Sequence, residues 1–290
     1  MAEEETMQDV KEEKTEETKA PEAKKAGLLQ RFYRFDIYIT MIIVLSILAA
    51  INMLNFGIMN TLPQLVVAIV VAALVEALWD RFKMKKWQYS KSAIITGIFI
   101  GSLLDPGQVL YVPAAAALIA ILSKQLIRLK MRHFFNPTLF SLLIVTVLFR
   151  TSIGWWSSAN MPATLALGLF ISVKYRRLGL TLPFLLTYFL IGVLLNPAVI
   201  TINGLTTSLL NMLNDTALMF FVFFMLVEPK TSPFSRRGRM IYGPVVAVLF
   251  FAAGMILPRV LGTTGLLLDQ TAATILIGNL IAWIMNWKMI

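Results

Sequence analysis

Two acid–proline pairs carry the residues of this sequence best suited to chemistry. Asp105-Pro106 and Glu228-Pro229 each follow a short apolar run. Proline removes a backbone donor and disfavours helix in the preceding residue, so each pair leaves carbonyls open to an ion or a polar ligand. Acids among apolar segments are costly and usually pair or bind something. The alternative is structural: both acids cap loops at the water interface, and bases near Glu228 form an ion pair with it.

Other polar residues extend this candidate set. Ser92 and Thr96 open the apolar run before Asp105, where small residues also let helices pack closely. Asn136-Pro137 is typical of a helix start, which directs free N–H groups toward the interior. The candidates for cofactor binding or an ion path are Ser92, Thr96, Asp105, Asn136, Glu228, Thr231 and Ser232.

Several kinds of site are excluded by composition. The chain has no cysteine and one histidine, so iron–sulfur clusters, bis-histidine haem and multi-histidine zinc lack their ligands within it. We predict no metal site. No self-contained catalytic constellation is present, and whether the chain acts as part of an enzyme stays open. The net charge of +10 does not indicate nucleic-acid binding, because the basic residues lie in short stretches between apolar runs.

The elements that position these residues must lie in a lipid bilayer. Apolar residues make up 58% of the chain and charged residues 14%. Residues 1–35 hold nine of the sixteen acids and seven of the twenty-six bases, so the other 255 residues carry only seven acids and nineteen bases. A soluble protein cannot cover its surface so sparsely.

The apolar runs predict an all-α membrane protein with about ten transmembrane helices. Their lengths vary, and the shorter ones must borrow flanking residues or be broken helices buried against protein. The predicted segments are 37–54, 65–79, 92–104, 110–123, 137–149, 160–173, 180–196, 216–227, 241–257 and 271–287.

Loop charge predicts the orientation. If the N-terminus is cytoplasmic and every segment crosses the membrane, the cytoplasmic loops hold seventeen bases. The outer loops then hold only Arg150 and Arg259. We therefore expect a multi-pass protein of the cytoplasmic (inner) membrane with both termini in the cytoplasm. Residues 1–28, rich in charge and poor in large apolar side chains, predict a disordered cytoplasmic tail before a membrane domain over 29–290.

The two halves of the chain repeat one pattern. Leu104-Asp105-Pro106 is followed by Tyr111-Val112-Pro113, and Val227-Glu228-Pro229 by Tyr242-Gly243-Pro244. The 123-residue offset between the acids also relates the first and sixth segments. Five helices per unit is odd, so the second unit must be inverted. We expect repeat one over about 37–150 and repeat two over about 160–288, with helices 3 and 8 short or broken.

Three smaller features complete these expectations. Glu76 is expected to reach the headgroup region and meet Arg81 or Lys83. Trp155 and Trp156 fall at an outer boundary, as in an aromatic belt. The loop 197–215 is polar enough for the surface, although its leucine-rich part also suits a re-entrant or interfacial helix.

Three motifs together resemble one known family. They are the stretch Ser92–Gly97, the stretch from Ser123-Lys124 through His133 to Asn136-Pro137, and Glu228–Pro233 followed by Gly238-Arg239 and Ile241–Gly243. The resemblance covers about residues 37–287. It is to the RnfD-like membrane protein shared by the Rnf electron-transport complex and the sodium-translocating NADH:quinone reductase. It implies two inverted five-helix repeats, and flavin-linked electron transfer across the membrane coupled to sodium or proton movement.

The chain departs from this family at the flavin. Members carry FMN on a threonine in a Ser-Gly-Ala-Thr-like motif, whereas the candidate here is Met161-Pro162-Ala163-Thr164. Thr164 is better explained as a helix-start residue, so covalent flavin there is not favoured. FMN or riboflavin is expected to bind non-covalently, if at all. The family's Asp-Pro is Glu228-Pro229 here, and the chain resembles a compact, divergent branch.

Two main functions follow from these observations. The first is a membrane subunit of a redox-driven ion pump, which needs a bound cofactor or other subunits because no side chain carries electrons unaided. The second is a transporter or channel for a small solute or cation that has kept the fold without flavin. A third class, an assembly scaffold, also stays open.

Overall fold

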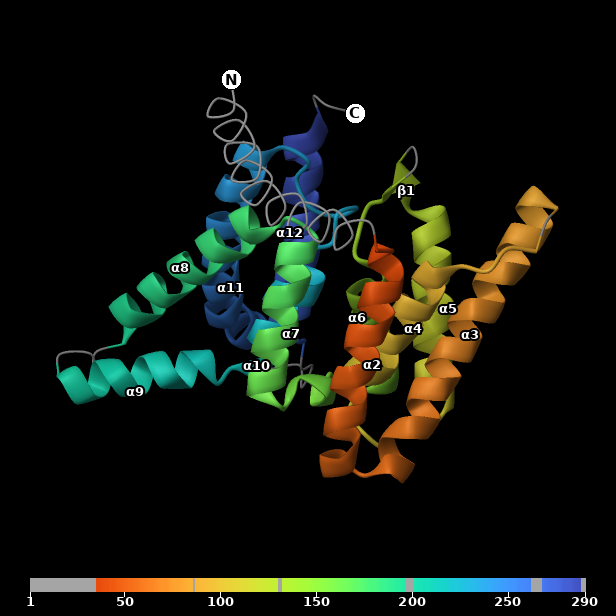
Figure 1. The fold of residues 1–290 in the computed structure, drawn as a ribbon, viewed down its shortest axis with the longest axis horizontal. Coiled ribbons are helices and arrows are strands. Elements are labelled where there is room, and N and C mark those ends of the chain that lie inside the picture. Colours follow the sequence, from red (N-terminus) through yellow and green to blue (C-terminus); the bar gives the residue numbers. More distant parts are fainter. Residues whose placement is uncertain (1–34, 86, 130–131, 197–200, 262–267, 288–290) are drawn as a thin grey trace, which may run out of the picture.

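The computed structural model describes residues 35–85, 87–129, 132–196, 201–261 and 268–287, and most of them are helical (Figure 1). The predicted tail over 1–28 lies outside the described residues. The first helices in chain order are α2 (Ile37–Phe56), α3 (Ile58–Met84), α4 (Lys91–Leu103), α5 (Tyr111–Leu126), α6 (Pro137–Phe149) and α7 (Met161–Lys174). They are followed by α8 (Leu178–Leu195), α9 (Ile202–Leu213), α10 (Thr216–Phe220), the π-helical turn η3 (Phe221–Met225), α11 (Arg236–Leu261) and α12 (Gln270–Asn286).

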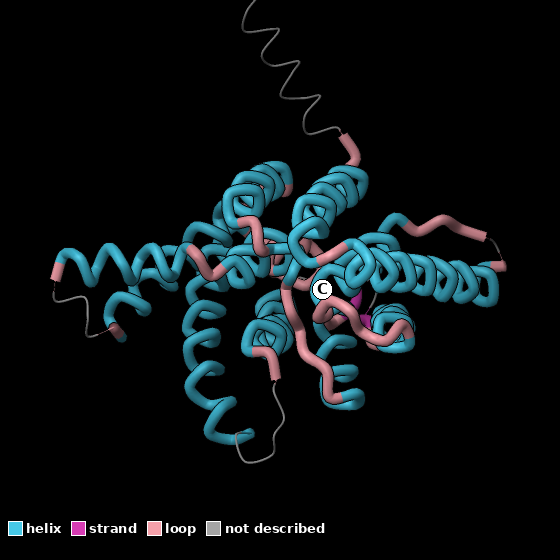
Figure 2. Tube along the Cα trace, turned by 90° about the horizontal axis from the view of Figure 1, so that it is seen from below, coloured by secondary structure: helices cyan, strands magenta, loops and turns pink. Residues whose placement is uncertain are grey.

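Two small elements interrupt the helices. The strands β1 (Arg128–Leu129) and β2 (Arg132–His133) pair antiparallel between α5 and α6. The 3-10 helix η1 (Trp156–Ser158) lies between α6 and α7. Seen from below, the helices spread outward from a common centre (Figure 2).

The predicted all-α membrane fold is confirmed. Each of the ten predicted segments coincides with a helix, and the eighth is α10 continued by η3. Among the described residues, α2, α8 and most of α3 and α11 are long and apolar enough to cross a membrane. The pair formed by α9 and α10–η3, bent by 54°, is a fifth candidate. The short helices at positions 3 and 8 are present, whereas ten full crossings remain a prediction.

The helix ends follow from local side-chain chemistry. Asp36, Ser90, Asn136, Asn160 and Asp269 begin helices by accepting hydrogen bonds from backbone N–H groups of the first turn. Such caps satisfy donors that have no partner within a helix. The described chain starts α2 and ends α12 on the same side (Figure 1), as an even number of crossings requires.

Contacts between helices support the predicted repeat. In the first half, α3 packs on α5, α5 on α6 and α2 on α4; in the second, α8 packs on α11, α11 on α12 and α7 on α10. Between the halves, α2 meets α7 and α6 meets α12, and Phe99 of α4 meets Phe220 of α10 with ring centroids 6.0 Å apart. Equivalent elements that meet each other are what a two-fold relation produces.

Two smaller expectations are answered here. The leucine-rich part of the loop 197–215 forms α9, which contacts α8 and extends outward from the centre of the molecule (Figure 1). The aromatic-belt interpretation of Trp155 and Trp156 is wrong: they are 6% and 1% exposed, respectively. The loop before α7 folds back under α2 and α4, so these indoles point into protein.

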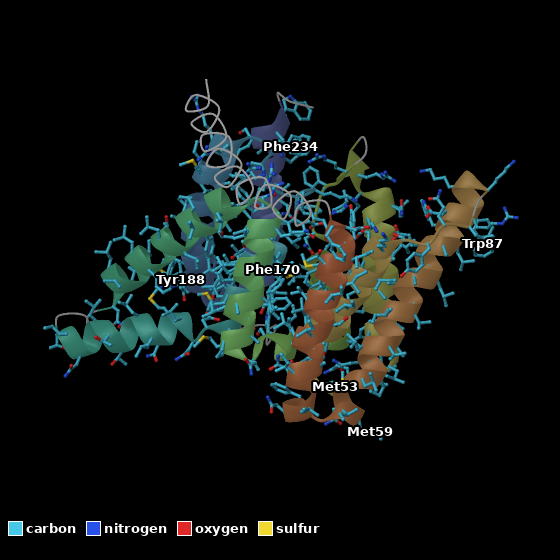
Figure 3. All side chains as sticks on the ribbon, viewed as in Figure 1. Met53, Met59, Trp87, Phe170, Tyr188 and Phe234 are labelled. Carbon is cyan, nitrogen blue, oxygen red and sulfur yellow. The ribbon has the colours of Figure 1, made fainter. Side chains whose placement is uncertain are left out.

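Large apolar side chains cover the outer faces of the helices (Figure 3). Met59, at the turn between α2 and α3, is 87% exposed, and exposed leucines follow α8 along its length. These faces suit a lipid surround, because lipid rather than water is the favourable solvent for them.

Close backbone contact joins α3 and α4. A Cβ atom on Gly97 would lie 2.5 Å from Ile69 Cα and 2.8 Å from Ala68 O, and one on Gly101 would lie 2.5 Å from Leu65 Cα. Small residues allow this approach, which is a common way for membrane helices to pack.

Gly97→Ala should therefore destabilise the protein by about 1–3 kcal/mol, since backbone atoms must move apart. Thermal unfolding in detergent would measure the loss. Gly179→Ala is the matched control, because a Cβ on this α8 residue meets only Met240 Cγ, at 3.9 Å. Equal melting temperatures for Gly97→Ala and the wild type would contradict the packing described.

Candidate functional site

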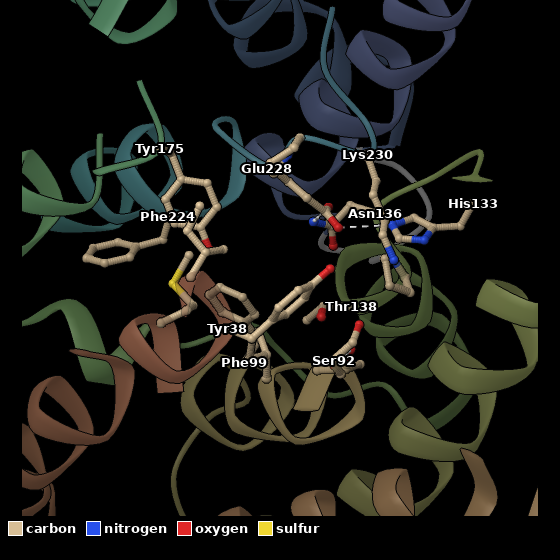
Figure 4. Close-up of a pocket in the computed structure, with 16 residues that line it drawn as sticks. Tyr38, Ser92, Phe99, His133, Asn136, Thr138, Tyr175, Phe224, Glu228 and Lys230 are labelled. Atoms are coloured by element: carbon tan, nitrogen blue, oxygen red, sulfur yellow. Dashed lines mark hydrogen bonds and ion pairs between the residues drawn. The ribbon is translucent and has the colours of Figure 1, made fainter. Parts of the chain in front are cut away.

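A cavity of about 110 Å³ lies between the two halves, and we call it the central cavity (Figure 4). The starts of α2 and α6, the first turns of α4 and the chain after η3 enclose it. Its lining contains four of the predicted candidates: Ser92, Thr96, Asn136 and Glu228. The fold brings these four residues, which are up to 136 positions apart in the chain, to one cavity, while their role in binding stays a prediction.

Aromatic side chains form another part of the lining. Tyr38 of α2, Phe99 of α4, Tyr175 at the end of α7 and Phe224 of η3 all contribute (Figure 4). The cavity therefore combines an aromatic wall with the hydroxyl and amide groups described above. A flat ligand with polar edges matches this combination, because such sites are mostly apolar with a few placed polar groups.

Glu228 is the polar centre of the cavity. Its Oε1 lies 2.9 Å from His133 Nε2, and its Oε2 accepts hydrogen bonds from Asn136 Nδ2 at 3.0 Å and Thr231 Oγ1 at 3.1 Å. Burial opposes the charge, but His133, Thr231 and Lys230 outweigh it and lower the pKa of the Glu228 carboxyl. The structural alternative expected bases near Glu228 in the sequence to pair with it, whereas the structure pairs its carboxyl with His133.

We call residues 228–235 the strap. Hydrogen bonds within the strap and between it and α12 hold Glu228 in place. Ser232 Oγ donates to the Glu228 carbonyl at 2.7 Å. Asn279 of α12 accepts from the Asn136 N–H at 2.7 Å and donates to Thr231 O at 3.3 Å. Thr231 and Ser232 therefore act on the geometry of the cavity through Glu228 and lie outside its lining.

A second, larger space adjoins the central cavity. This vestibule, of about 780 Å³, shares Ser92, His133 and Lys230 with it and is otherwise lined mainly by polar and charged residues. The other lining residues are Glu76, Trp79, Asp80, Lys83, Gln88, Ser90, Lys124, Gln125 and Arg128. The vestibule gives the central cavity a polar approach from the side of the strap.

Comparison with known families places the first half of the chain. Residues 34–170 match the sequence model of the NQR2, RnfD, RnfE family, which is slightly less than half of the 290 residues. Residues 34–170 belong to this family. No curated protein matches the chain.

The family match confirms the resemblance predicted from the motifs in this region. It supports, in general terms, a membrane subunit of an ion-translocating electron-transport complex. The matched region runs from the start of α2 into α7, so it contains Ser92, Thr96 and Asn136. Glu228 completes the same cavity from beyond the match.

The structure places Asp105, the other acid of the repeat, away from the central cavity. It lies at the opposite end of α4, where its carboxylate accepts a hydrogen bond from Ser152 Oγ. Its backbone N–H donates to Ser152 O at 3.4 Å. The two acid–proline pairs are therefore brought to different ends of the short helix α4.

Thr164, the residue expected to carry a covalent flavin if any did, is fully buried in the first turns of α7. Its hydroxyl donates to Ser158 O at 3.0 Å. Thr164 does not line the central cavity. A hydroxyl used in this way at the start of a helix agrees with the structural interpretation of this residue.

The expected partner of Glu76 is wrong. Its carboxylate pairs with Lys124 of α5, with Nζ–O distances of 2.7 and 2.8 Å, and the two side chains are only 8% and 7% exposed. The helices α3 and α5 pack against each other at the wall of the vestibule, and this packing buries the pair. Tyr38 and Tyr175 are site residues that sequence reasoning missed, because nothing in their local pattern distinguishes them from interfacial aromatics. Lys124 and Lys230 fall within the family motifs but were not proposed as site residues.

Lys124→Met should cost about 3–5 kcal/mol of stability, because it leaves the Glu76 charge buried without a partner. The double variant Glu76→Leu, Lys124→Met should recover most of the loss. Lys83→Met, which removes an exposed base of the same vestibule, should change stability by less than about 0.5 kcal/mol. Thermal unfolding of the four proteins measures these effects. A Lys124→Met variant as stable as the wild type would overturn the buried pair.

Proposed function

We propose that this chain is the membrane subunit of a redox-driven ion pump, and that it binds FMN or riboflavin non-covalently in the central cavity. The observation that carries this proposal is a cavity of mixed aromatic and polar lining between the two halves of a chain whose first half belongs to the family. Bound flavin would supply the electron transfer that no side chain of this sequence can perform.

The residues present fit a flavin in kind. The aromatic wall suits a flat ring system, and Ser92, Asn136 and Thr138 offer hydrogen-bond groups to its polar edges. The central cavity alone is smaller than the roughly 300–1,000 Å³ of most ligand sites. Together with the adjoining vestibule the space falls within this range, and Lys83, Arg128 and Lys230 lie where a phosphate tail would extend.

The acids support coupling to sodium or protons. Glu228 faces the central cavity at one end of α4, and Asp105 lies at the other end. A cation moving along α4 would meet a carboxylate at each end, and at the Glu228 end His133 Nε2 lies 2.9 Å from that carboxylate. Other subunits of a redox complex would deliver and remove the electrons, with the strap and vestibule on the cytoplasmic side of an inner membrane.

A second candidate function is transport of a small solute or cation without flavin. The small volume of the central cavity is the observation that favours it. Asp105 and Glu228 would serve the same path in that case. The two candidates differ in whether the purified protein holds flavin.

Protein purified from a flavin-sufficient host should show flavin absorbance, and acid precipitation should release all of it into the supernatant. Phe224→Ala should lower the bound flavin at least several-fold, because it removes part of the aromatic wall. Phe251→Ala, which removes an aromatic of α11 outside the cavity, is the matched control. A colourless protein that also takes up no flavin on reconstitution would exclude the flavin proposal and favour the transporter.

Sodium or proton flux into proteoliposomes should fall about tenfold or more in Asp105→Asn and in Glu228→Gln, because each removes a charge from the proposed path. Asp36→Asn is the control, since this acid pairs with Lys91 at the start of α2 and does not line the central cavity. Unchanged flux in both path variants would remove these acids from the mechanism.

A further inference from the structure

A small pocket with basic walls lies beside the strap, and we call it the strap pocket. It has a volume of about 30 Å³. Six of its lining residues carry side-chain nitrogen atoms: Arg132, His133, Lys230, Asn279, Trp283 and Asn286. Within the described part of the chain, no acidic residue lines it. A water needs about 10–15 Å³ of such space, so the pocket has room for two oxygens, as in one carboxylate.

The strap pocket offers donors more than acceptors. The Oδ1 atoms of Asn279 and Asn286 already accept backbone N–H groups, at 2.7 and 3.0 Å. Their Nδ2 atoms donate to strap carbonyls at 3.3 and 3.4 Å, so these carbonyls are also occupied. Trp283 Nε1 is buried and has no hydrogen-bond partner among the described residues. Buried donors in proteins almost always have partners, so this indole favours a ligand that brings an acceptor.

Positive charge gathers around the strap. Arg132, Arg177 and Arg239 each donate to a strap carbonyl, at 3.2, 3.1 and 3.3 Å. The guanidinium of Arg132 also lies 3.7 Å from the ring centroid of Phe234. Neither these arginines nor Lys230 form a salt bridge within the described residues, although Arg177 is only 7% exposed. Charges with so little contact with solvent are usually paired, so this cluster favours an anionic partner.

We propose that the strap pocket binds a glutamate side chain from the acidic N-terminal segment of the same chain, residues 3–17. This segment holds eight acids and two bases, a net charge of −6, whereas residues 18–34 hold one acid and five bases. A carboxylate only accepts hydrogen bonds, and it accepts them most strongly from charged donors such as Arg132 and Lys230. The segment and the pocket are therefore complementary in both charge and hydrogen bonding.

The segment joins the described fold close to the pocket. Tyr38, at the start of α2, lines the central cavity together with Lys230, which also lines the strap pocket (Figure 4). The eighteen residue steps from Glu17 to Phe35 span about 27 Å as a helix and up to about 60 Å when extended. A ligand tethered in this way reaches an effective concentration on the order of millimolar, which fills even a weak site.

Docking of this segment goes beyond the proposed function and depends on neither flavin nor ion movement. Lys230 lines the strap pocket, the central cavity and the vestibule. A docked segment would therefore hold the strap in position and cover the polar approach to the central cavity.

The test is the distance between two spin labels on the full-length protein in detergent, attached at Thr15→Cys in the segment and Met240→Cys in α11. The chain has no cysteine of its own, so only these two sites are labelled. Met240 is 50% exposed and does not line the strap pocket. A narrow distance distribution is expected at low salt, and 1 M salt should broaden it by screening the charges.

Lys230→Gln should lower the narrow population at least several-fold, because it removes a cation of the pocket that forms no described salt bridge. Lys85→Gln is the matched control, because this exposed base at the end of α3 lies outside the pocket. Neutralising the segment should have the effect of Lys230→Gln without any change to the described fold. The variant for this carries Glu12→Gln, Glu13→Gln, Glu16→Gln and Glu17→Gln.

Each outcome decides the proposal. A broad distribution before any charge is removed would overturn it and assign the pocket to an acidic segment of another subunit. Equal losses in Lys85→Gln and Lys230→Gln would also overturn it, because the segment would then follow the overall charge of this face instead of the pocket. A narrow population that persists in the neutralised segment would separate docking from its carboxylates and would likewise contradict the proposal.

Discussion

The hydrogen bonds of the Glu228 carboxylate determine the shape of the central cavity. They join the strap of the second half to the start of α6 in the first half, through groups 92 and 95 residues away in the chain. Asn279 closes the ring from α12 by bonding both Asn136 and Thr231. Hydrogen bonds to a charged group are stronger than neutral ones, and they act here beside the hydrogen bond that Arg132 donates to Pro229 O. Lys230 of this strap lines both the central cavity and the vestibule, so the position of the strap bears on both.

Most of the secondary structure could be predicted from the sequence. Apolar runs, capping residues and prolines mark the helices to within a few residues for most of them, because a membrane leaves the backbone few alternatives to helix. A repeat could also be proposed, since an acid–proline pair interrupts the chain at a matching point in each half, and it remains a prediction. Ser92, Thr96, Asn136 and Glu228 could be proposed together because each is a polar residue at the end of an apolar run.

The rest of the site depends on packing that a linear pattern does not contain. Glu76 and Lys124 are 48 residues apart, and only the approach of α3 and α5 shows that they pair with each other instead of with loop charges. Trp155 and Trp156 have the composition of an interfacial pair, yet a fold of the loop before α7 buries them.

The shortness of α4 has a consequence for how this molecule would respond to voltage. Thirteen residues rise only about 20 Å, whereas the hydrocarbon core of a bilayer is about 30 Å thick. The central cavity and its polar vestibule reach the first turns of this helix from one side. In a membrane, the electrical potential would therefore fall over a distance shorter than the bilayer itself. A single charge displaced along α4 would exchange about 2.3 kcal/mol with each 100 mV of potential while moving only about two-thirds of the hydrocarbon thickness.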